Sequence, residues 1–209
     1  MSYKTEQESF WAGEFGKEYI NRNNAEEAIA TNIALFSNIF KSTNSISSVI
    51  EFGANIGINL QAIKQLLPSV DVSAVEINPE AVKLLKSKIS PKKISHCSIL
   101  DYNADQLFDL VLIKGVLIHL EPEELPNVYS KLYESADKYI CIAEYYNPTP
   151  IEVPYRGFSK KLFKRDFAGE ILDMYPNLEL VDYGFVYHRD NNFKQDDLTW
   201  FLLEKKQSS

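Results

Sequence analysis

The sequence lacks the features that define several other classes of protein. It contains 2 cysteines, Cys97 and Cys141, and their spacing fits neither a disulfide framework nor a metal site. Lys and Arg total 22 against 29 Asp and Glu, so the net charge of −7 offers no broad positive field to a nucleic-acid backbone. No apolar run approaches the ~18–20 residues of a membrane-spanning helix, and the first residues lack a secretory signal pattern. We therefore expect a cytoplasmic protein without a metal, a membrane anchor or a nucleic-acid partner.

The composition favours one globular domain. The 209 residues are 45% hydrophobic and 12% aromatic, which is enough to fill a sizeable core. The sequence predicts three parts within this single domain: a helical cap over residues 1–45, a core over residues 46–145, and an insertion with a terminal hairpin over residues 146–209. In the cap, Glu6–Phe40 follows a helical pattern with a break at Asn21–Asn24.

From Ile46 onward, β-branched runs alternate with amphipathic stretches, which is typical of βαβ units and a parallel sheet. The connection Asp190–Asp197 is too short for a parallel crossover, so the last two strands should pair antiparallel. These patterns predict an α/β, Rossmann-like fold: a seven-stranded, mostly parallel sheet with an antiparallel last strand, helices on both faces and an N-terminal helical cap. The expected strands are Ser48–Gly53, Val70–Ile77, Lys93–Ile99, Phe108–Gly115, Lys138–Tyr145, Glu179–Tyr187 and Leu198–Glu204. The expected helices are Asn59–Leu67, Pro79–Lys88, Pro122–Ala136 and Lys160–Tyr175.

The most specific motif is the segment Val49–Leu60, in which a buried strand runs into a turn of small residues that opens a helix. Gly53 and Gly57 lack a Cβ, so the backbone can approach a ligand closely, and Asn55 is among the few non-glycine residues that tolerate positive φ. In open α/β sheets, nucleotide-like ligands bind beyond the carboxyl ends of the strands. The segment therefore predicts a ligand at this turn.

An acidic residue, Glu76, ends the next expected strand about 20 residues beyond the turn, the separation at which a carboxylate accepts hydrogen bonds from a ribose diol. This spacing implies an adenosine. The chain has no G-x-G-x-x-G pattern, which makes a dinucleotide such as NAD less favoured. Glu51 would repel a pyrophosphate but suits a ligand with an ammonium group and a sulfonium centre. S-adenosylmethionine meets this description.

Together these segments resemble the class I S-adenosylmethionine-dependent methyltransferases, and the resemblance covers Ile46–Tyr145. It rests on the turn and Glu76 and also on the segments Cys97–Leu100 and Phe108–Val116. The resemblance implies that Glu51, Gly53, Asn55 and Gly57 surround the methionine part, that Glu76 with Ile77 beside it holds the ribose, that Ser98 and Ile99 lie against adenine, and that Lys114 and Gly115 line the cofactor. In this chain Asn55 stands where the family more usually has glycine.

A narrower resemblance spans nearly the whole chain. Phe10–Ile20, Tyr155–Phe158, Asp166–Gly169 and Tyr183–Asp190 look like segments of the methylases associated with pseudaminic acid biosynthesis. This resemblance implies methyl transfer to a hydroxyl or amino group of a small acidic sugar or nucleotide-activated sugar, linked to the nonulosonic acids of bacterial surface glycans.

Further candidates fall into three groups. His119 and Glu144 follow the fourth and fifth expected strands and are candidate general bases, although each could instead be structural. We expect Trp11, Tyr19 and Arg22 to form a lid over the cofactor. The alternative is that they belong to a helix that only packs on the sheet. The C-terminal third combines cationic and aromatic residues that we expect to form an acceptor site for an anionic sugar: Tyr145, Tyr146, Tyr155, Arg156, His188 and Arg189. The alternative is that the arginines lie on the surface and the aromatic residues fill the core.

Two other functions stay open at this point. A nicotinamide-dependent oxidoreductase would share the strand order and the ribose acid. A non-catalytic protein could use the same fold to sense the cofactor or to hold a biosynthetic partner. Titration with NAD tests the first alternative, and cofactor binding without turnover would indicate the second.

Overall fold

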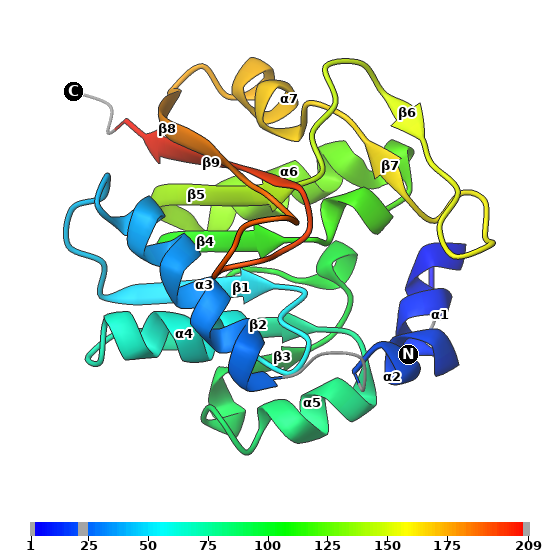
Figure 1. Ribbon diagram of the computed structural model, residues 1–209, viewed down its shortest axis with the longest axis horizontal. Coiled ribbons are helices and arrows are strands. Elements are labelled where there is room, and N and C mark those ends of the chain that lie inside the picture. Colours follow the sequence, from blue (N-terminus) through cyan, green and yellow to red (C-terminus); the bar gives the residue numbers. More distant parts are fainter. Residues whose placement is uncertain (1–2, 21–24, 207–209) are drawn as a thin grey trace.

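The computed structural model describes residues 3–20 and 25–206, and a single large sheet carries the fold (Figure 1). Its strands are β1 (Ser48–Phe52), β2 (Asp71–Glu76), β3 (Ile94–His96), β4 (Phe108–Lys114), β5 (Ala136–Glu144), β8 (Leu178–Val186) and β9 (Leu198–Lys205). They pair as a 7-stranded sheet in the order β3-β2-β1-β4-β5-β9-β8. Strands β1 to β5 run parallel, and β9 is antiparallel to both β5 and β8. The predicted Rossmann-like sheet is therefore confirmed.

Helices cover both faces of the sheet (Figure 1). They are α1 (Glu6–Ala12), α2 (Glu14–Ile20), α3 (Ala25–Phe40), α4 (Ile58–Leu66), α5 (Pro79–Leu85), α6 (Leu125–Ser135) and α7 (Phe167–Met174). On one face, α3 to α5 bury side chains such as Phe36 and Leu60 against the sheet. On the other face, α6 and α7 bury Leu132 and Ile171. Burial at ~25 cal/mol per Å² of apolar surface makes these two layers the main source of stability.

The sequence prediction was wrong in the insertion and at several element ends. The first part of the expected helix Lys160–Tyr175 instead contains β7 (Phe163–Lys164), which pairs antiparallel with β6 (Ile151–Glu152). The helix starts only at Phe167, because the Asp166 side chain accepts a hydrogen bond from the N–H of Gly169 (2.8 Å) and caps it.

The N-terminal cap is broken earlier than expected. Helix α1 ends at Ala12, and Gly13 has extended backbone angles, so α2 starts as a separate helix. The expected break at Asn21–Asn24 lies outside the described residues. The expected strand Lys93–Ile99 is reduced to the three residues of β3. The expected helix at Pro122 begins with a short 3-10 turn, Pro122–Glu124, before α6.

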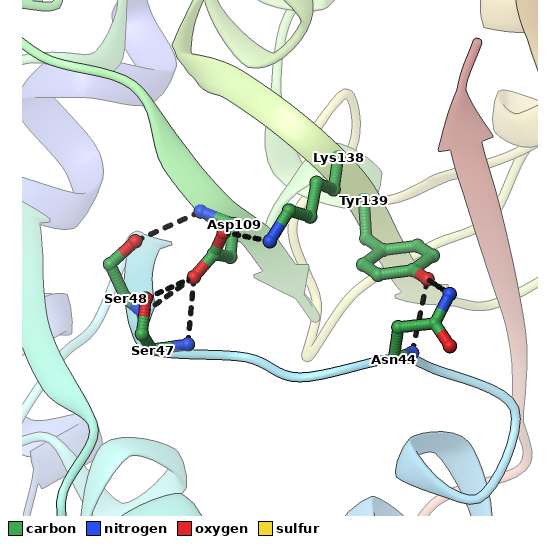
Figure 2. Close-up of polar contacts among 6 residues, drawn as sticks. All are labelled: Asn44, Ser47, Ser48, Asp109, Lys138 and Tyr139. Carbon is green, nitrogen blue, oxygen red and sulfur yellow. Dashed lines mark hydrogen bonds and ion pairs between the residues drawn. The ribbon is translucent and has the colours of Figure 1, made fainter. Parts of the chain in front are cut away.

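Asp109 holds the amino end of the sheet together (Figure 2). Its Oδ2 accepts hydrogen bonds from the N–H of Ser47 (2.7 Å), from the Ser47 hydroxyl and from the N–H of Ser48 (3.2 Å). Its Oδ1 lies 2.7 Å from Nζ of Lys138. Burial opposes ionisation, but the ion pair and the hydrogen bonds outweigh it and lower the pKa of Asp109 to about 2. This carboxylate therefore ties the start of β1 to the starts of β4 and β5.

The described residues contain neither a membrane-spanning helix nor a cluster of metal ligands. No helix combines the length and the apolar composition needed to cross a bilayer. No three His, Cys, Asp or Glu side chains in the part of the chain that the structure describes gather as a metal site would require.

Candidate functional site

A cavity of about 740 Å³ opens at the carboxyl ends of the parallel strands. This is the edge at which open α/β sheets bind ligands. Most of the residues singled out in the sequence line it: Trp11, Tyr19, Gly53, Asn55, Glu76, Ile77, Ser98, Ile99, Lys114, Gly115, His119, Tyr145, Tyr155, Arg156 and His188. The fold thus brings the predicted cofactor turn and part of the predicted acceptor site to one place.

The turn after β1 has the expected backbone. Gly53, Asn55 and Gly57 have φ values of 74°, 48° and 74°, in the left-handed region. A Cβ on Gly53 would lie 2.6 Å from Val116, beside the cavity. A Cβ on Gly57 would instead lie 2.5 Å from Leu85 of α5. Gly57 is not among the residues that line the cavity, so its expected place around the methionine part stays a prediction; its missing Cβ leaves room for Leu85 of α5.

Glu76 is fixed at the cavity wall. Its Oε2 accepts the N–H of Asn55 and its Oε1 accepts the N–H of Asn78, each at 2.7 Å. The side chain is buried, and burial raises its pKa although these bonds oppose the shift. Each carboxylate oxygen has a second lone pair, so the group can still accept hydrogen bonds from a diol.

Several buried polar atoms around the cavity have no hydrogen-bond partner among the described residues. They are the acceptors Oδ1 of Asn55, Oδ1 of Asn32 and Oε1 of Gln7, and the donor Nε1 of Trp11. Unsatisfied buried polar atoms cost about 1–3 kcal/mol each, so their concentration at one cavity points to a polar ligand. An ammonium group would satisfy the acceptors and a carboxylate the donor, and the residues present fit the amino-acid end of S-adenosylmethionine.

Glu51 is buried and is not among the residues that line the cavity, so its expected contact with the methionine part stays a prediction. Asn59 donates a hydrogen bond to Oε1 (2.5 Å), whereas Oε2 is buried without a partner among the described residues. Burial raises the pKa of Glu51 to about 8. The partly buried amine of Lys114 lines the cavity nearby, and burial lowers its pKa although Glu51 opposes the shift.

His119 is held in one tautomer. Its Nδ1–H donates to the carbonyl oxygen of Lys161 (2.6 Å), so Nε2 is the acceptor nitrogen of the neutral ring. The ring centroid lies 4.6 Å from that of Trp11 and 4.9 Å from that of Tyr155. Burial lowers the pKa of His119 to about 4. At neutral pH this imidazole is uncharged and able to accept a proton.

Glu144 and His119 have different places in the structure. Glu144 does not line the cavity; its Oε1 accepts the N–H groups of Val116 and Leu117, each at 2.9 Å. Burial raises its pKa to about 7. The carboxylate thus supports the turn that carries His119 into the cavity, which favours the structural role for Glu144, and its role as a general base stays a prediction.

Helices α1 and α2 of the N-terminal cap lie beyond the carboxyl ends of the strands (Figure 1), and Gln7 and Trp11 of α1 line the cavity. Nδ2 of Asn78 donates to the carbonyl oxygen of Trp11 (2.9 Å). Glu6 of α1 forms an ion pair with Lys161, whose side chain is 4% exposed (2.7 Å). Tyr19 also lines the cavity, and Arg22 lies outside the described residues.

Four of the residues predicted for the acceptor site, Tyr145, Tyr155, Arg156 and His188, line the cavity. Tyr146 and Arg189 are not among the lining residues, and their part in the acceptor site stays a prediction. The sequence analysis missed further lining residues, namely Gln7, Thr31, Asn32, Lys194, Gln195 and Asp196. Two of them, Thr31 and Asn32, are buried polar residues in the middle of α3.

Comparisons with known proteins agree with this geometry. Residues 50–137 match the family model described as a methyltransferase domain. A search of curated proteins found no match.

Solved structures resemble the chain at low identity. The Burkholderia thailandensis 1,6-didemethyltoxoflavin-N1-methyltransferase, bound to S-adenosylhomocysteine, is 14% identical with a TM-score of 0.66, over 92% of this chain and 83% of that one. A Leishmania major S-adenosylmethionine-dependent methyltransferase is 15% identical with a TM-score of 0.69, over 96% and 87%. The Synechocystis magnesium protoporphyrin IX methyltransferase, bound to S-adenosylmethionine, is 12% identical with a TM-score of 0.64, over 99% and 100%.

The match to the family model and the shared fold together indicate the class of this protein. Residues 50–137 match a methyltransferase domain, and the chain has the fold of S-adenosylmethionine-dependent methyltransferases, several of which are solved with S-adenosylmethionine or S-adenosylhomocysteine bound. At this level the predicted enzyme class and cofactor are confirmed. The neighbours act on a toxoflavin precursor and a porphyrin according to their names, so none of these comparisons supports the narrower resemblance to pseudaminic acid methylases.

Proposed function

We propose that this protein transfers the methyl group of S-adenosylmethionine to a hydroxyl or amino group of a small acidic sugar or nucleotide-activated sugar. The observation that carries the cofactor part is Glu76, held by two backbone N–H groups at the wall of a cavity with unsatisfied polar atoms. The acceptor part draws support from the cationic and aromatic residues on the opposite side of that cavity.

The cofactor's three parts have matching residues. Glu76 would accept hydrogen bonds from the ribose hydroxyls, and Ile99 would pack on the adenine. Asn55 would take the ammonium group on its Oδ1, and Trp11 would donate its Nε1–H to the carboxylate. When bound, the cofactor supplies a methyl group activated by positive sulfur.

His119 would accept the proton that the acceptor loses. Its neutral Nε2 is available at pH 7 because burial keeps the pKa of the ring near 4. The Lys161 carbonyl fixes the tautomer, and Trp11 and Tyr155 fix the ring plane. Positioning and water exclusion supply the remaining rate enhancement in an in-line displacement.

An acidic acceptor is favoured by the cationic side chains of Arg156 and Lys194, which line the cavity together with the acidic Glu121, Glu124 and Asp196. The guanidinium of Arg156 matches a carboxylate or phosphate in a bidentate arrangement, and it lies 5.7 Å from the centroid of the Tyr155 ring. His188 and Lys194 add further donors at the cavity wall. This chemistry favours a small anion with several hydroxyl groups.

The test is incubation with labelled S-adenosylmethionine and a panel of nonulosonic acids and their precursors, followed by mass analysis. A mass gain of one methyl group in an acidic sugar supports the proposal. Calorimetry with S-adenosylhomocysteine is the control: absence of binding would remove the cofactor part. Binding without any methylated product would favour the non-catalytic alternative, and binding of NAD instead would favour the oxidoreductase.

A further inference from the structure

Three side chains of helix α1 contact Lys160 and Lys161, which directly precede β7 (Figure 1). Oε1 of Glu6 lies 2.7 Å from Nζ of Lys161, and Nε2 of Gln7 donates to the carbonyl oxygen of Lys160 (3.2 Å). The centroid of the Phe10 ring lies 5.3 Å from the same Nζ. Glu6 and Phe10 are four residues apart, so one face of the helix supplies both contacts to the ammonium group. The N-terminal cap therefore holds this pair of lysines.

The same two residues determine how His119 is held. The carbonyl oxygen of Lys161 accepts the Nδ1–H of His119 (2.6 Å), and this acceptor decides which ring nitrogen carries the proton. Lys160 has a φ of 55°, in the left-handed region that few residues other than glycine adopt. Such a backbone conformation persists only where surrounding contacts offset its cost. The position of the carbonyl thus depends on contacts from outside the segment.

The ion pair between Glu6 and Lys161 joins a buried group to an exposed one. The Lys161 side chain is 4% exposed and that of Glu6 is 77% exposed. The hydrogen bond from Lys161 lowers the pKa of Glu6, so the carboxylate is ionised at neutral pH. A buried ammonium group without a counter-charge is strongly disfavoured and would move toward water. Because the Lys161 carbonyl belongs to the same residue, that movement would withdraw the acceptor from His119.

We propose that Glu6 is a positioning residue for His119. By neutralising the buried Lys161 ammonium, Glu6 keeps the Lys161 carbonyl on Nδ1–H and leaves Nε2 as the nitrogen that can accept a proton. Docking of α1 and correct orientation of the base are then one event. The inference rests on the proposed function for the use of His119 as a base, but the tautomer itself can be measured without an acceptor substrate.

The test is NMR of the full-length protein with isotopically labelled histidine at pH 7, where the ring nitrogens report which of them is protonated. The chain has 3 histidines, and the signals of His119 are assigned by their loss in His119→Asn. Wild type should show the Nδ1–H form. In Glu6→Lys the ratio of Nδ1–H to Nε2–H should fall at least about fivefold, the change in an equilibrium that one hydrogen bond produces.

Two further variants separate positioning from a general disturbance of the cap. The charge-swapped variant Glu6→Lys, Lys161→Glu keeps the summed length of the two side chains and should restore the wild-type ratio. The matched control is Glu14→Lys, which removes an exposed ion pair with Lys17 on α2 and should leave His119 unchanged. Glu6 and Glu14 are both largely exposed, so the single variants should fold, and circular dichroism checks this.

Three outcomes would overturn the inference: a wild-type tautomer ratio in Glu6→Lys, an equal change in Glu14→Lys, or no recovery in the charge-swapped variant. The proposed function is tested separately. Absence of methyl transfer by a wild type that shows the Nδ1–H form would count against the function and leave the positioning contact standing. Methyl transfer by a wild type whose tautomer does not respond to Glu6→Lys would count against the positioning role alone.

Discussion

Buried carboxylates at the two ends of the sheet have pKa values shifted in opposite directions. At the amino end, the Asp109 carboxylate has its hydrogen bonds and an ion pair, and its pKa falls to about 2 (Figure 2). At the carboxyl end, burial raises the pKa of Glu51 to about 8 and that of Glu144 to about 7, and each keeps one oxygen without a partner among the described residues. The amino end stabilises the fold, whereas the carboxyl end carries buried carboxylates whose hydrogen bonding is incomplete.

This contrast is typical of functional sites in α/β proteins. Catalytic and binding groups need shifted protonation states and unsatisfied polar atoms, and both lower the stability of the unliganded protein. His119, with its pKa lowered to about 4, belongs to the same end as these carboxylates. Substitutions of cavity-lining residues at the carboxyl end should therefore change binding and turnover, and those at the amino end should change the free energy of unfolding.

The largest expected effect is on turnover in His119→Asn. The Asn side chain can still donate to the Lys161 carbonyl but cannot accept a proton, so kcat should fall by about 10²–10⁴. Because the folded pKa is about 4, the wild-type rate should stay constant from pH 8 to about pH 5 and fall only below that. Single-turnover assays across this range measure both. His96→Asn, at an exposed position outside the cavity, should keep wild-type turnover.

The next effect is on cofactor affinity in Glu76→Ala. Loss of the ribose contact should weaken S-adenosylhomocysteine binding by ~1–3 kcal/mol, the range for a hydrogen bond to a charged group. Calorimetry measures it, with Glu80→Ala as the matched control, because Glu80 lies on α5 outside the cavity. Unchanged affinity in Glu76→Ala would contradict the ribose role.

At the amino end, Asp109→Asn should destabilise the protein without changing binding. The carboxylate pKa falls from 3.8 to about 2, which corresponds to about 2 kcal/mol of stability at neutral pH. A depressed pKa contributes above the unfolded value and is lost as the pH falls, so the gap between wild type and variant should close between about pH 4 and pH 2. Urea unfolding at several pH values measures it. Asp71→Asn, which removes an exposed ion pair with Lys93, should change little.

The sequence was most informative where the signal is local. The turn residues Gly53 and Asn55 and the strand-end acid Glu76 lie close together in the chain, and backbone conformation and strand length place them. The sheet order followed from alternation of strand and helix patterns and from one short connection. These features depend on a few neighbouring residues, so pattern reasoning reached them.

It was least informative where distant segments meet. Whether Glu144 faces the cavity or the backbone of Val116 depends on how the turn after β4 packs, which no spacing in the chain reveals. Likewise, Asn32 reaches the cavity only because α3 lies against that end of the sheet. Gly57 fulfils the turn motif but faces Leu85, since the motif specifies backbone angles and not which atoms lie opposite.

The smallest expected effect on turnover is that of Glu144→Gln. This variant tests whether Glu144 supports the fold or takes part in catalysis. A raised pKa means that stability is fully present below the unfolded value of 4.5 and is lost as the pH rises through about 7. Glu144→Gln keeps an oxygen for the N–H groups of Val116 and Leu117 but cannot ionise, so it should exceed the wild type in unfolding free energy by up to about 3 kcal/mol at pH 8 and match it at pH 4. If turnover in this variant fell as far as in His119→Asn, Glu144 would belong to the chemistry and the division between the two residues would fail.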